Sequence, residues 1–502
     1  ADLRRLAAAC LIVGFEGAAP ADVPLDRLRT LSPGGVILFA RNVAGPPETV
    51  KELVDAVRAA LEYDVPPIVA IDQEGGRVAR LREGVADIPS MMALAAAGDA
   101  ELTERVGYQI GYDLARAGVN VDFAPVADLA ILPRNTVIGT RSFGSDPARV
   151  AELAFALGRG LERAGRVATY KHFPGHGSTD VDSHLELPVV DLAANVLRSR
   201  DLVPFARAID RGARAIMCAH VVIRALDARL PATLSHAVLS GVLRDELGFE
   251  GVCFTDCMEM DAIARHWGVE DAAVLALAAG ADAVLISHSL DRAQRAVDAI
   301  VTAAGEGTLP LARLEEAARR VHHLRALLSE RVPDAPDDDA GRLAAERAVT
   351  LLRGDPALRG GEVDIISFDD RSAEGAEERI DVQSFLSEAL TRRGMHVRPV
   401  TLPIDPDPAS VPPLRAARPI VIARRAHGYA RQKQAIDLIL DRAPGAIVVS
   451  AREPFDVPLF ARAATVLCTY GDGRALMDAL AGVLAGAAPA HGRLPITLGA
   501  PC

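Results

Sequence analysis

The sequence has little of what marks several common classes of protein. Six of its 502 residues are cysteine and no CxxC pair occurs, which is typical of buried thiols in a reducing compartment rather than of a disulfide framework. Acidic residues outnumber basic ones, 67 to 55, so the net charge is −12. Because nucleic acids and anionic membranes select for basic surfaces, we expect neither as a partner.

The sequence also lacks a long apolar segment at its N-terminus. The apolar patch in ADLRRLAAACLIVGFEG is too short to cross a membrane and continues into a predicted strand. It is not typical of a signal peptide, so we expect a cytoplasmic protein. Half of the residues are apolar and 24% are charged, as in ordinary globular domains. This composition fits a small-molecule substrate and leaves a homodimer open.

The chain is longer than the roughly 250–300 residues at which one core usually stops growing, so we expect two domains. Before residue 290, short apolar runs alternate with segments that carry apolar residues at helical spacing. The eight runs predicted to be strands are LIVGF, GVILF, PIVAID, VDFAPV, RVATYKH, AIMCAH, GVCFTD and AVLISH. Eight alternating units predict an α/β protein with a (β/α)8 TIM-like barrel. An open, doubly wound sheet is the alternative.

The composition changes after about residue 330. RVPDAPDDDAG is acidic and contains proline, as linkers often do, and GRLAAERAVTLLRG, residues 341–354, is helix-like. Five more strands are predicted, at VDIISF, HVRPVTL, PIVIAR, AIVVSA and TVLCTY. We therefore expect a barrel domain over residues 1–330, a linker over 331–345 and an α/β sandwich domain over 346–502.

Polar residues follow most of the predicted barrel strands. They are Asp72, Asp128, Lys171, His172, His220, Asp256 and His288. Barrel enzymes carry their chemistry at the carboxyl ends of the strands, although a single Asp in this position commonly caps a helix. The recurrence of polar residues after most of the strands favours an active site over a set of helix caps.

The densest group of candidates is KHFPGHGSTDVDSH, residues 171–184. In its last part, Asp182 and His184 are close enough for the carboxylate to accept a hydrogen bond from one imidazole nitrogen. Such a bond fixes the tautomer and makes the pair a proton donor and acceptor near neutral pH. The alternative is a loop closed by an Asx turn, with a histidine in solvent.

Asp256, in FTDCMEMDAI, is a candidate nucleophile. A carboxylate at the end of a barrel strand can attack an electrophilic carbon, such as the anomeric carbon of a glycoside. The alternative is the N-cap of a helix that begins at Cys257. Cys257 follows Cys253 by four residues without a second cysteine pair, so we expect both to be core thiols.

Other polar residues could hold the hydroxyl groups of a sugar. The candidates are Asp72, Arg77 and Arg80 in DQEGGRVAR, Arg141 in GTRSFGSDP, and Lys171 with His172. Carboxylates and arginines bind sugar hydroxyls, but they also form buried ion pairs, and the sequence leaves both open.

Histidines and aspartates are dense in this segment, so a metal site is a further alternative. His172 and His176 have the spacing of a zinc-ligand pair on a helix. Pro174, Gly175 and Gly177 exclude that helix. We therefore expect no catalytic metal and no cofactor.

Four motifs resemble, in order, those of the NagZ-type β-N-acetylglucosaminidases of glycoside hydrolase family 3: IDQEGGRVAR, RSFGSDP, KHFPGHGSTDVDSH and FTDCMEM. GRLPITL resembles the end of the family's second domain, so the resemblance covers nearly the whole chain. It implies a (β/α)8 barrel followed by an α/β sandwich. It also implies that Asp256 is the nucleophile and that Asp182 and His184 form the acid/base pair. The positions that match sugar-binding residues are Asp72, Arg80, Arg141, Lys171 and His172. His176 matches a residue that orders its loop.

The resemblance implies a retaining reaction in two steps, with a glycosyl-enzyme formed on Asp256. An imidazole acid/base does not repel phosphate as a carboxylate would, so inorganic phosphate could replace water and give a sugar 1-phosphate. The sequence favours neither a hydrolase nor a phosphorylase, and it leaves β-glucosides open beside β-N-acetylglucosaminides. A barrel that binds sugar without catalysis is the alternative of a different class.

Overall fold

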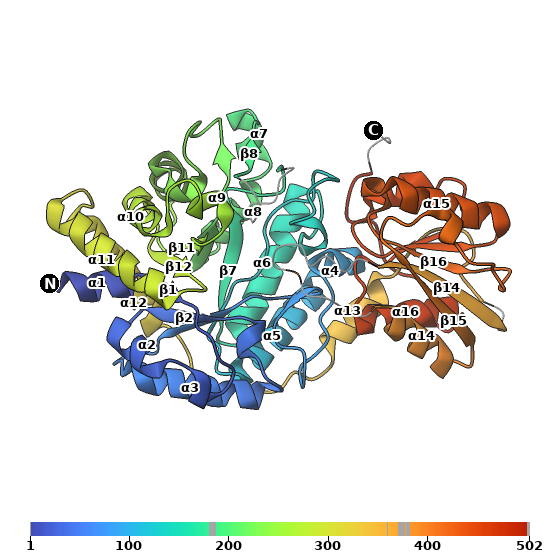
Figure 1. The fold of residues 1–502 in the computed structure, drawn as a ribbon, viewed down its shortest axis with the longest axis horizontal. Coiled ribbons are helices and arrows are strands. Elements are labelled where there is room, and N and C mark those ends of the chain that lie inside the picture. The colour runs from blue at the N-terminus through green and yellow to red at the C-terminus, as the bar shows by residue number, and fades with distance from the viewer. Residues whose placement is uncertain (1, 180–186, 359, 370–376, 378–381, 499–502) are drawn as a thin grey trace.

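The computed structural model describes residues 2–179, 187–358, 360–369, 377 and 382–498. Its N-terminal part, blue to yellow in Figure 1, forms a closed barrel, and its C-terminal part, orange to red, forms an open sheet beside it. Helix α13 (Ala340–Ala348) connects the two parts. None of the described helices is long and apolar enough to cross a membrane.

Eight parallel strands close the barrel in the order β1-β12-β11-β9-β7-β6-β3-β2. Their bounds are β1 (Leu11–Val13), β2 (Gly35–Leu38), β3 (Ile68–Ile71), β6 (Val121–Asp122), β7 (Val167–Phe173), β9 (Ala215–Cys218), β11 (Val252–Cys257) and β12 (Ala283–Ile286). Each overlaps one of the eight predicted runs. The (β/α)8 barrel is confirmed, and the open-sheet alternative for this part is wrong.

The barrel strands are buried on both faces, which explains why they read as continuous apolar runs rather than as alternating ones. One set of side chains fills the interior, where the rings of Phe123 and Phe254 meet edge to face with centroids 5.3 Å apart. The other set packs against the surrounding helices. Because the interior is packed, a ligand has room at the strand ends rather than inside the barrel.

The helices of the barrel part begin at side-chain caps in several places: Asp99, Asp146 and Ser289 each accept a hydrogen bond from a backbone N–H of the first turn. The bounds are α1 (Leu3–Ala9), α2 (Leu25–Leu31), α3 (Pro47–Leu61), α4 (Met91–Ala97), α5 (Ala100–Arg116), α6 (Pro147–Arg163), α7 (Ala194–Ser199), α8 (Val203–Asp210), a helix over Ala237–Glu246, α9 (Asp261–Ala264), α10 (Val269–Ala279), α11 (Leu290–Glu306) and α12 (Leu311–Ala326). Two small sheets lie over the strand ends: β4 (Gln73–Gly75) with β5 (Val78–Ala79), and β8 (Val189–Val190) with β10 (Val222–Ile223).

The second sheet has the order β13-β18-β17-β16-β14-β15. Its elements are β13 (Thr350–Arg353), β14 (Glu362–Asp369), α14 (Val382–Arg392), β15 (His396–Pro403), β16 (Ile420–Ala423), α15 (Ala430–Arg442), β17 (Ile447–Ser450), β18 (Thr465–Cys468) and α16 (Arg474–Leu484). Ile365 and Ile420 face the core under α14 and α16, whereas Ile366 and Val421 face the core under α15. The expected sheet with helices on both faces is therefore present (Figure 1).

The predicted helix over residues 341–354 is wrong in its second half. Helix α13 ends at Ala348, and Thr350–Arg353 form β13, which pairs antiparallel with β18. The apolar spacing of this segment continues the helix, but pairing satisfies backbone groups that the edge strand β18 would otherwise expose. Tertiary contact overrides the local pattern here.

Candidate active site

A cavity of about 560 Å³ opens at the carboxyl ends of the barrel strands. Its lining includes six residues selected from the sequence: Asp72, Arg80, Arg141, Lys171, His172 and Asp256. They come from segments far apart in the chain, and the barrel brings them together because all of its strands end on the same side. Asp182 and His184, the other two selected residues, lie outside the described residues.

Asp256 is the fifth residue of β11 and is half-buried in the wall of the cavity. The register between β11 and β12 shifts between Phe254 and Cys257, so this part of β11 carries a bulge. Bulges re-aim side chains at strand ends. The helix-cap alternative is wrong, because β11 continues to Cys257 and the next helix, α9, begins only at Asp261.

Four charged residues form a cluster in the wall of the site. Asp72 follows β3, Glu74 lies in β4, Arg141 ends the short helix Gly139–Arg141 after β6, and Lys171 lies in β7. Arg141 donates two hydrogen bonds to Glu74, from Nε to Oε2 and from Nη2 to Oε1, each of 2.8 Å. Lys171 Nζ lies 2.6 Å from both Asp72 Oδ1 and Glu74 Oε1. The side chains of Glu74, Arg141 and Lys171 are almost fully buried. Two positive charges and two negative charges thus hold one another in a fixed geometry.

The cluster keeps Glu74 and Lys171 charged. Burial alone would raise the pKa of the Glu74 carboxyl, but Arg141 and Lys171 outweigh burial and hold this pKa well below its usual range. Burial likewise would lower the pKa of Lys171, and Asp72 with Glu74 raises it instead. The cluster therefore presents fixed donors and acceptors to a neutral, hydroxyl-rich ligand.

His172 is oriented by a buried carboxylate. Asp128 Oδ2 accepts hydrogen bonds from the His172 backbone N–H, at 3.1 Å, and from the ring at Nδ1, at 2.6 Å. Asp128 Oδ1 accepts the backbone N–H of His176 at 2.7 Å. Burial opposes the charge of Asp128, but His172 and His176 outweigh it and lower the pKa of this carboxyl. With Nδ1 held by Asp128, the other ring nitrogen of His172 faces Arg141 Nη2 at 3.5 Å.

His176 belongs to the same loop but is held differently. Its ring Nδ1 lies 2.8 Å from Thr179 Oγ1, and its carbonyl accepts a hydrogen bond of 2.8 Å from Asn135 Nδ2. Burial, followed by the neighbouring His172, lowers the pKa of His176 to about 4. The ring is therefore neutral at neutral pH, and its contacts tie the loop to the segment before α6.

The two arginines of DQEGGRVAR separate in the structure. Arg80 lines the cavity, and its backbone N–H donates to Gln73 Oε1 at 2.8 Å, which fixes the turn between β4 and β5. Arg77 points to the second sheet instead, where its Nη2 lies 2.6 Å from Asp472 Oδ2. Arg77 is therefore the ion-pair member of this motif and holds the two parts of the chain together.

Glu74, Asp128 and Glu377 are among the residues that line or order the site without being predicted as site residues from the sequence. Glu74 lies two positions after Asp72 in the same motif, and this position could have indicated it as a site residue. Glu377 belongs to the second part of the chain, lines the barrel's cavity and pairs with Arg452. No pattern in the sequence indicates that this residue reaches the barrel.

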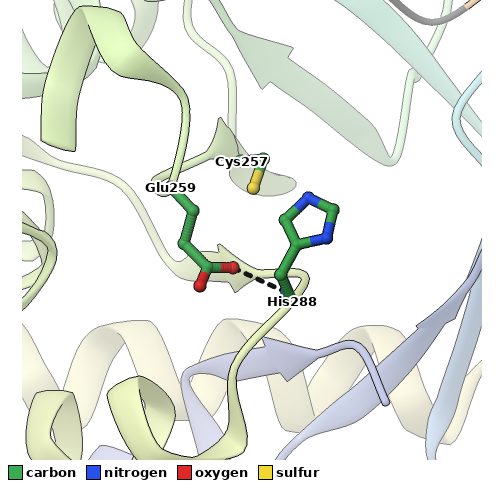
Figure 2. A group of neighbouring side chains, drawn as sticks. All are labelled: Cys257, Glu259 and His288. Atoms are coloured by element: carbon green, nitrogen blue, oxygen red, sulfur yellow. Dashed lines mark hydrogen bonds between the residues drawn. The ribbon is translucent and has the colours of Figure 1, made fainter. Parts of the chain in front are cut away.

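One group on the cavity wall carries metal-ligand atoms close together. Among the described residues, Cys257, Glu259 and His288 place one sulfur, oxygen or nitrogen atom each within 4.8 Å of one another (Figure 2). Cys257 was expected to be a core thiol, and that expectation is wrong: it is half-buried and lines the cavity.

A parallel eight-stranded barrel with a polar cavity at the carboxyl ends of its strands defines a class of barrel enzymes. Comparison with known proteins is more specific. Residues 14–324 match the model of the glycosyl hydrolase family 3 N-terminal domain. A β-hexosaminidase from Chromobacterium violaceum is 37% identical over 361 residues, which cover 70% of this chain and 97% of that protein.

Solved structures agree over the whole length. A glycoside hydrolase family 3 β-N-acetylglucosaminidase from Paenibacillus sp. str. FPU-7 has a TM-score of 0.92 and 35% identity, with 99% of each chain covered. A β-glucoside phosphorylase has a TM-score of 0.82 at 20% identity, over 99% of this chain and 94% of that one, and shares the fold. The chain belongs to glycosyl hydrolase family 3 and is a glycoside hydrolase.

Proposed function

We propose that the protein is a retaining β-N-acetylglucosaminidase that removes terminal, non-reducing N-acetylglucosamine from β-glycosides. The observation that carries this proposal is the placement of Asp256 in the same cavity as Asp72, Arg80, Arg141, Lys171 and His172. The names of the similar proteins from Chromobacterium violaceum and Paenibacillus support the choice of sugar. β-Glucosides are the second substrate class to be tested.

The proposed reaction has two steps. In the first, an oxygen of Asp256 attacks the anomeric carbon, the glycosidic bond breaks, and His184, steered by Asp182, gives its proton to the departing oxygen. In the second, His184 takes a proton from water as the water oxygen attacks the anomeric carbon and Asp256 leaves. Each step inverts the anomeric carbon, so the product keeps the β configuration. Arg141, Lys171 and their carboxylate partners hold the sugar hydroxyls meanwhile.

The charge balance of the cavity favours water over phosphate as the acceptor. The positive charges of Arg141 and Lys171 are matched by the negative charges of Glu74 and Asp72. A phosphate dianion gains little from cations whose charges are already matched, whereas a neutral water molecule needs no such surplus. We therefore propose hydrolysis. Detection of phosphorolysis would show that the choice of water as the acceptor is wrong.

The test compares aryl β-N-acetylglucosaminide and aryl β-glucoside donors in phosphate buffer and in phosphate-free buffer. We expect the N-acetylglucosaminide to be cleaved faster, at a rate independent of phosphate, and free β-N-acetylglucosamine to be the first product seen by NMR. A sugar 1-phosphate, or acceleration by phosphate, would overturn the choice of acceptor. A first product in the α configuration would overturn the retaining mechanism.

The nucleophile is tested separately with a 2-deoxy-2-fluoro or 5-fluoro glycosyl donor followed by peptide mass spectrometry. We expect the label on Asp256. Asp256→Asn protein is the control, and it should form no adduct. Equal turnover by the wild-type and Asp256→Asn proteins would instead favour a barrel that binds sugar without this chemistry, and a label on another residue would assign the nucleophile elsewhere.

A further inference from the structure

Cys257, Glu259 and His288 converge on one space in the cavity wall. Cys257 ends β11, Glu259 lies between β11 and α9, and His288 follows β12, which is the neighbour of β11 in the barrel. Figure 2 shows the Cys257 sulfur, the Glu259 carboxylate and the His288 ring arranged around this space. All three residues line the same cavity as Asp256.

The donor set suits zinc and related ions. Thiolate, imidazole and carboxylate are the three ligand types that zinc takes in proteins, with bonds of about 2.0–2.3 Å. In a tetrahedral site such bonds place neighbouring ligand atoms roughly 3.5 Å apart. The three atoms already lie within 4.8 Å of one another, so small side-chain rotations bring them to that spacing. Three protein ligands leave the fourth position to water.

The surroundings hold two of the ligands in place. Glu259 Oε2 accepts the backbone N–H of His288 at 2.6 Å, and Glu259 Oε1 lies 3.6 Å from Arg292 Nη1. The His288 ring stacks on Phe39 with centroids 5.7 Å apart. Contacts of this kind orient ligands before a metal arrives.

We propose that Cys257, Glu259 and His288 form a binding site for zinc-like divalent ions, and that an ion bound there inhibits the enzyme by occupying the cavity beside Asp256. The inhibition rests on the proposed function, since it requires this cavity to be the substrate site. The binding of the ion does not depend on the proposed function. Ion binding and inhibition are therefore measured separately.

Binding must release a proton. The thiol of Cys257 loses its proton to the buffer as the sulfur–metal bond forms, and no redox step is involved.

The experiment titrates metal-free protein with Cd²⁺, whose bond to a thiolate gives an ultraviolet charge-transfer band, and with Zn²⁺ by calorimetry. We expect one ion per chain, the thiolate band, and competitive inhibition of an aryl glycoside assay that EDTA reverses. Cys257→Ser should abolish the band, and His288→Gln, at an exposed position, should weaken binding at least about 100-fold. His266→Gln, at another exposed histidine, is the matched control and should bind like the wild type.

Wild-type affinity in both Cys257→Ser and His288→Gln would overturn the proposal and assign the ion to another place in the cavity. Absence of the thiolate band in the wild type would also overturn it. Failure of the proposed function has a different signature: the aryl glycosides are not cleaved, while the band and its loss in Cys257→Ser remain.

Discussion

Glu74 provides a sharp test of how the charged cluster supports the site. Its carboxylate is 1% exposed and accepts hydrogen bonds from both Arg141 and Lys171. Replacing Glu74 by Gln keeps the shape of the side chain but removes one negative charge. Arg141 and Lys171 then keep Asp72 as the one carboxylate of the cluster, and its remaining charges sum to +1.

The expected cost follows from this imbalance. Removing one partner of a buried ion pair destabilises a protein by about 3–5 kcal/mol, because the other charge is left buried without compensation. The loss corresponds to a decrease of roughly 10²- to 10⁴-fold in the folding equilibrium constant, at about 1.36 kcal/mol per factor of ten. An exposed pair gives a matched control: Glu388 and Arg474 form a 3.0 Å ion pair with side chains 50% and 56% exposed. Glu388→Gln should cost less than about 1 kcal/mol.

Denaturant unfolding measures both variants. Trp267, the one tryptophan of the chain, lies between α9 and α10 of the barrel, so its fluorescence reports on the barrel. We expect a much lower midpoint for Glu74→Gln and an unchanged one for Glu388→Gln. Equal midpoints for the two variants would refute the view that Glu74 compensates buried positive charge in the cluster.

The stability difference between wild type and Glu74→Gln should also depend on pH in a defined direction. Burial opposes the charge of Glu74, but Arg141 and Lys171 hold its pKa in the folded protein below the ordinary value of 4.5. A depressed folded-state pKa gives stability that is present above the unfolded-state value and is lost as pH falls through the folded-state value. The difference in stability between wild type and Glu74→Gln should therefore be full at pH 6 to 7 and shrink below about pH 4.5. A difference that grows as the pH falls would contradict this account.

Three further predictions concern other residues. Asp256→Asn should lower kcat at least about 10⁴-fold with little change in the unfolding midpoint, and retained activity in a kinetic assay would exclude it as the nucleophile. His184→Ala should lose the neutral-pH limb of the kcat/KM profile and act faster on aryl glycosides with good leaving groups than on those with poor ones; an unchanged profile would remove His184 from the acid/base role. Arg77→Ala should destabilise the protein, because Asp472 loses its 2.6 Å ion pair with Arg77 and keeps the 3.3 Å pair with Arg424. The cost should stay below the roughly 3–5 kcal/mol seen when a buried charge is left without compensation. Limited proteolysis should then cut between the two parts of the chain; unchanged protease resistance would contradict a role in holding them together.

Local patterns predicted the barrel well because its strands are buried on both faces. Each strand is then an apolar run that is visible without knowledge of its neighbours, and the polar residue that ends it is visible too. Asp72, Lys171 and Asp256 were found in this way. Local patterns failed where an edge had to be paired: the apolar spacing continues past Ala348, but β13 forms because β18 needs a partner.

The chemistry of single residues was harder to predict than their position. His220 ends a barrel strand as Asp256 does, yet its ring lies 2.9 Å from the Cys257 carbonyl and 2.8 Å from Thr233 Oγ1, so it holds backbone in place. His288 ends the next strand and lines the cavity. In the sequence these residues follow their strands in the same way. Only the direction of each side chain in the folded protein shows which of them line the cavity.

The sequence by itself determined the eight-stranded barrel, the order of the motifs and the residues that follow each strand, because periodicity and strand-end polarity are local properties. Tertiary structure decided which charges neutralise one another, that Arg77 pairs with Asp472, and that Glu377 from the second part of the chain lines the cavity. These outcomes depend on distances between segments far apart in the chain. Such distances arise only when the barrel closes and the second sheet packs beside it.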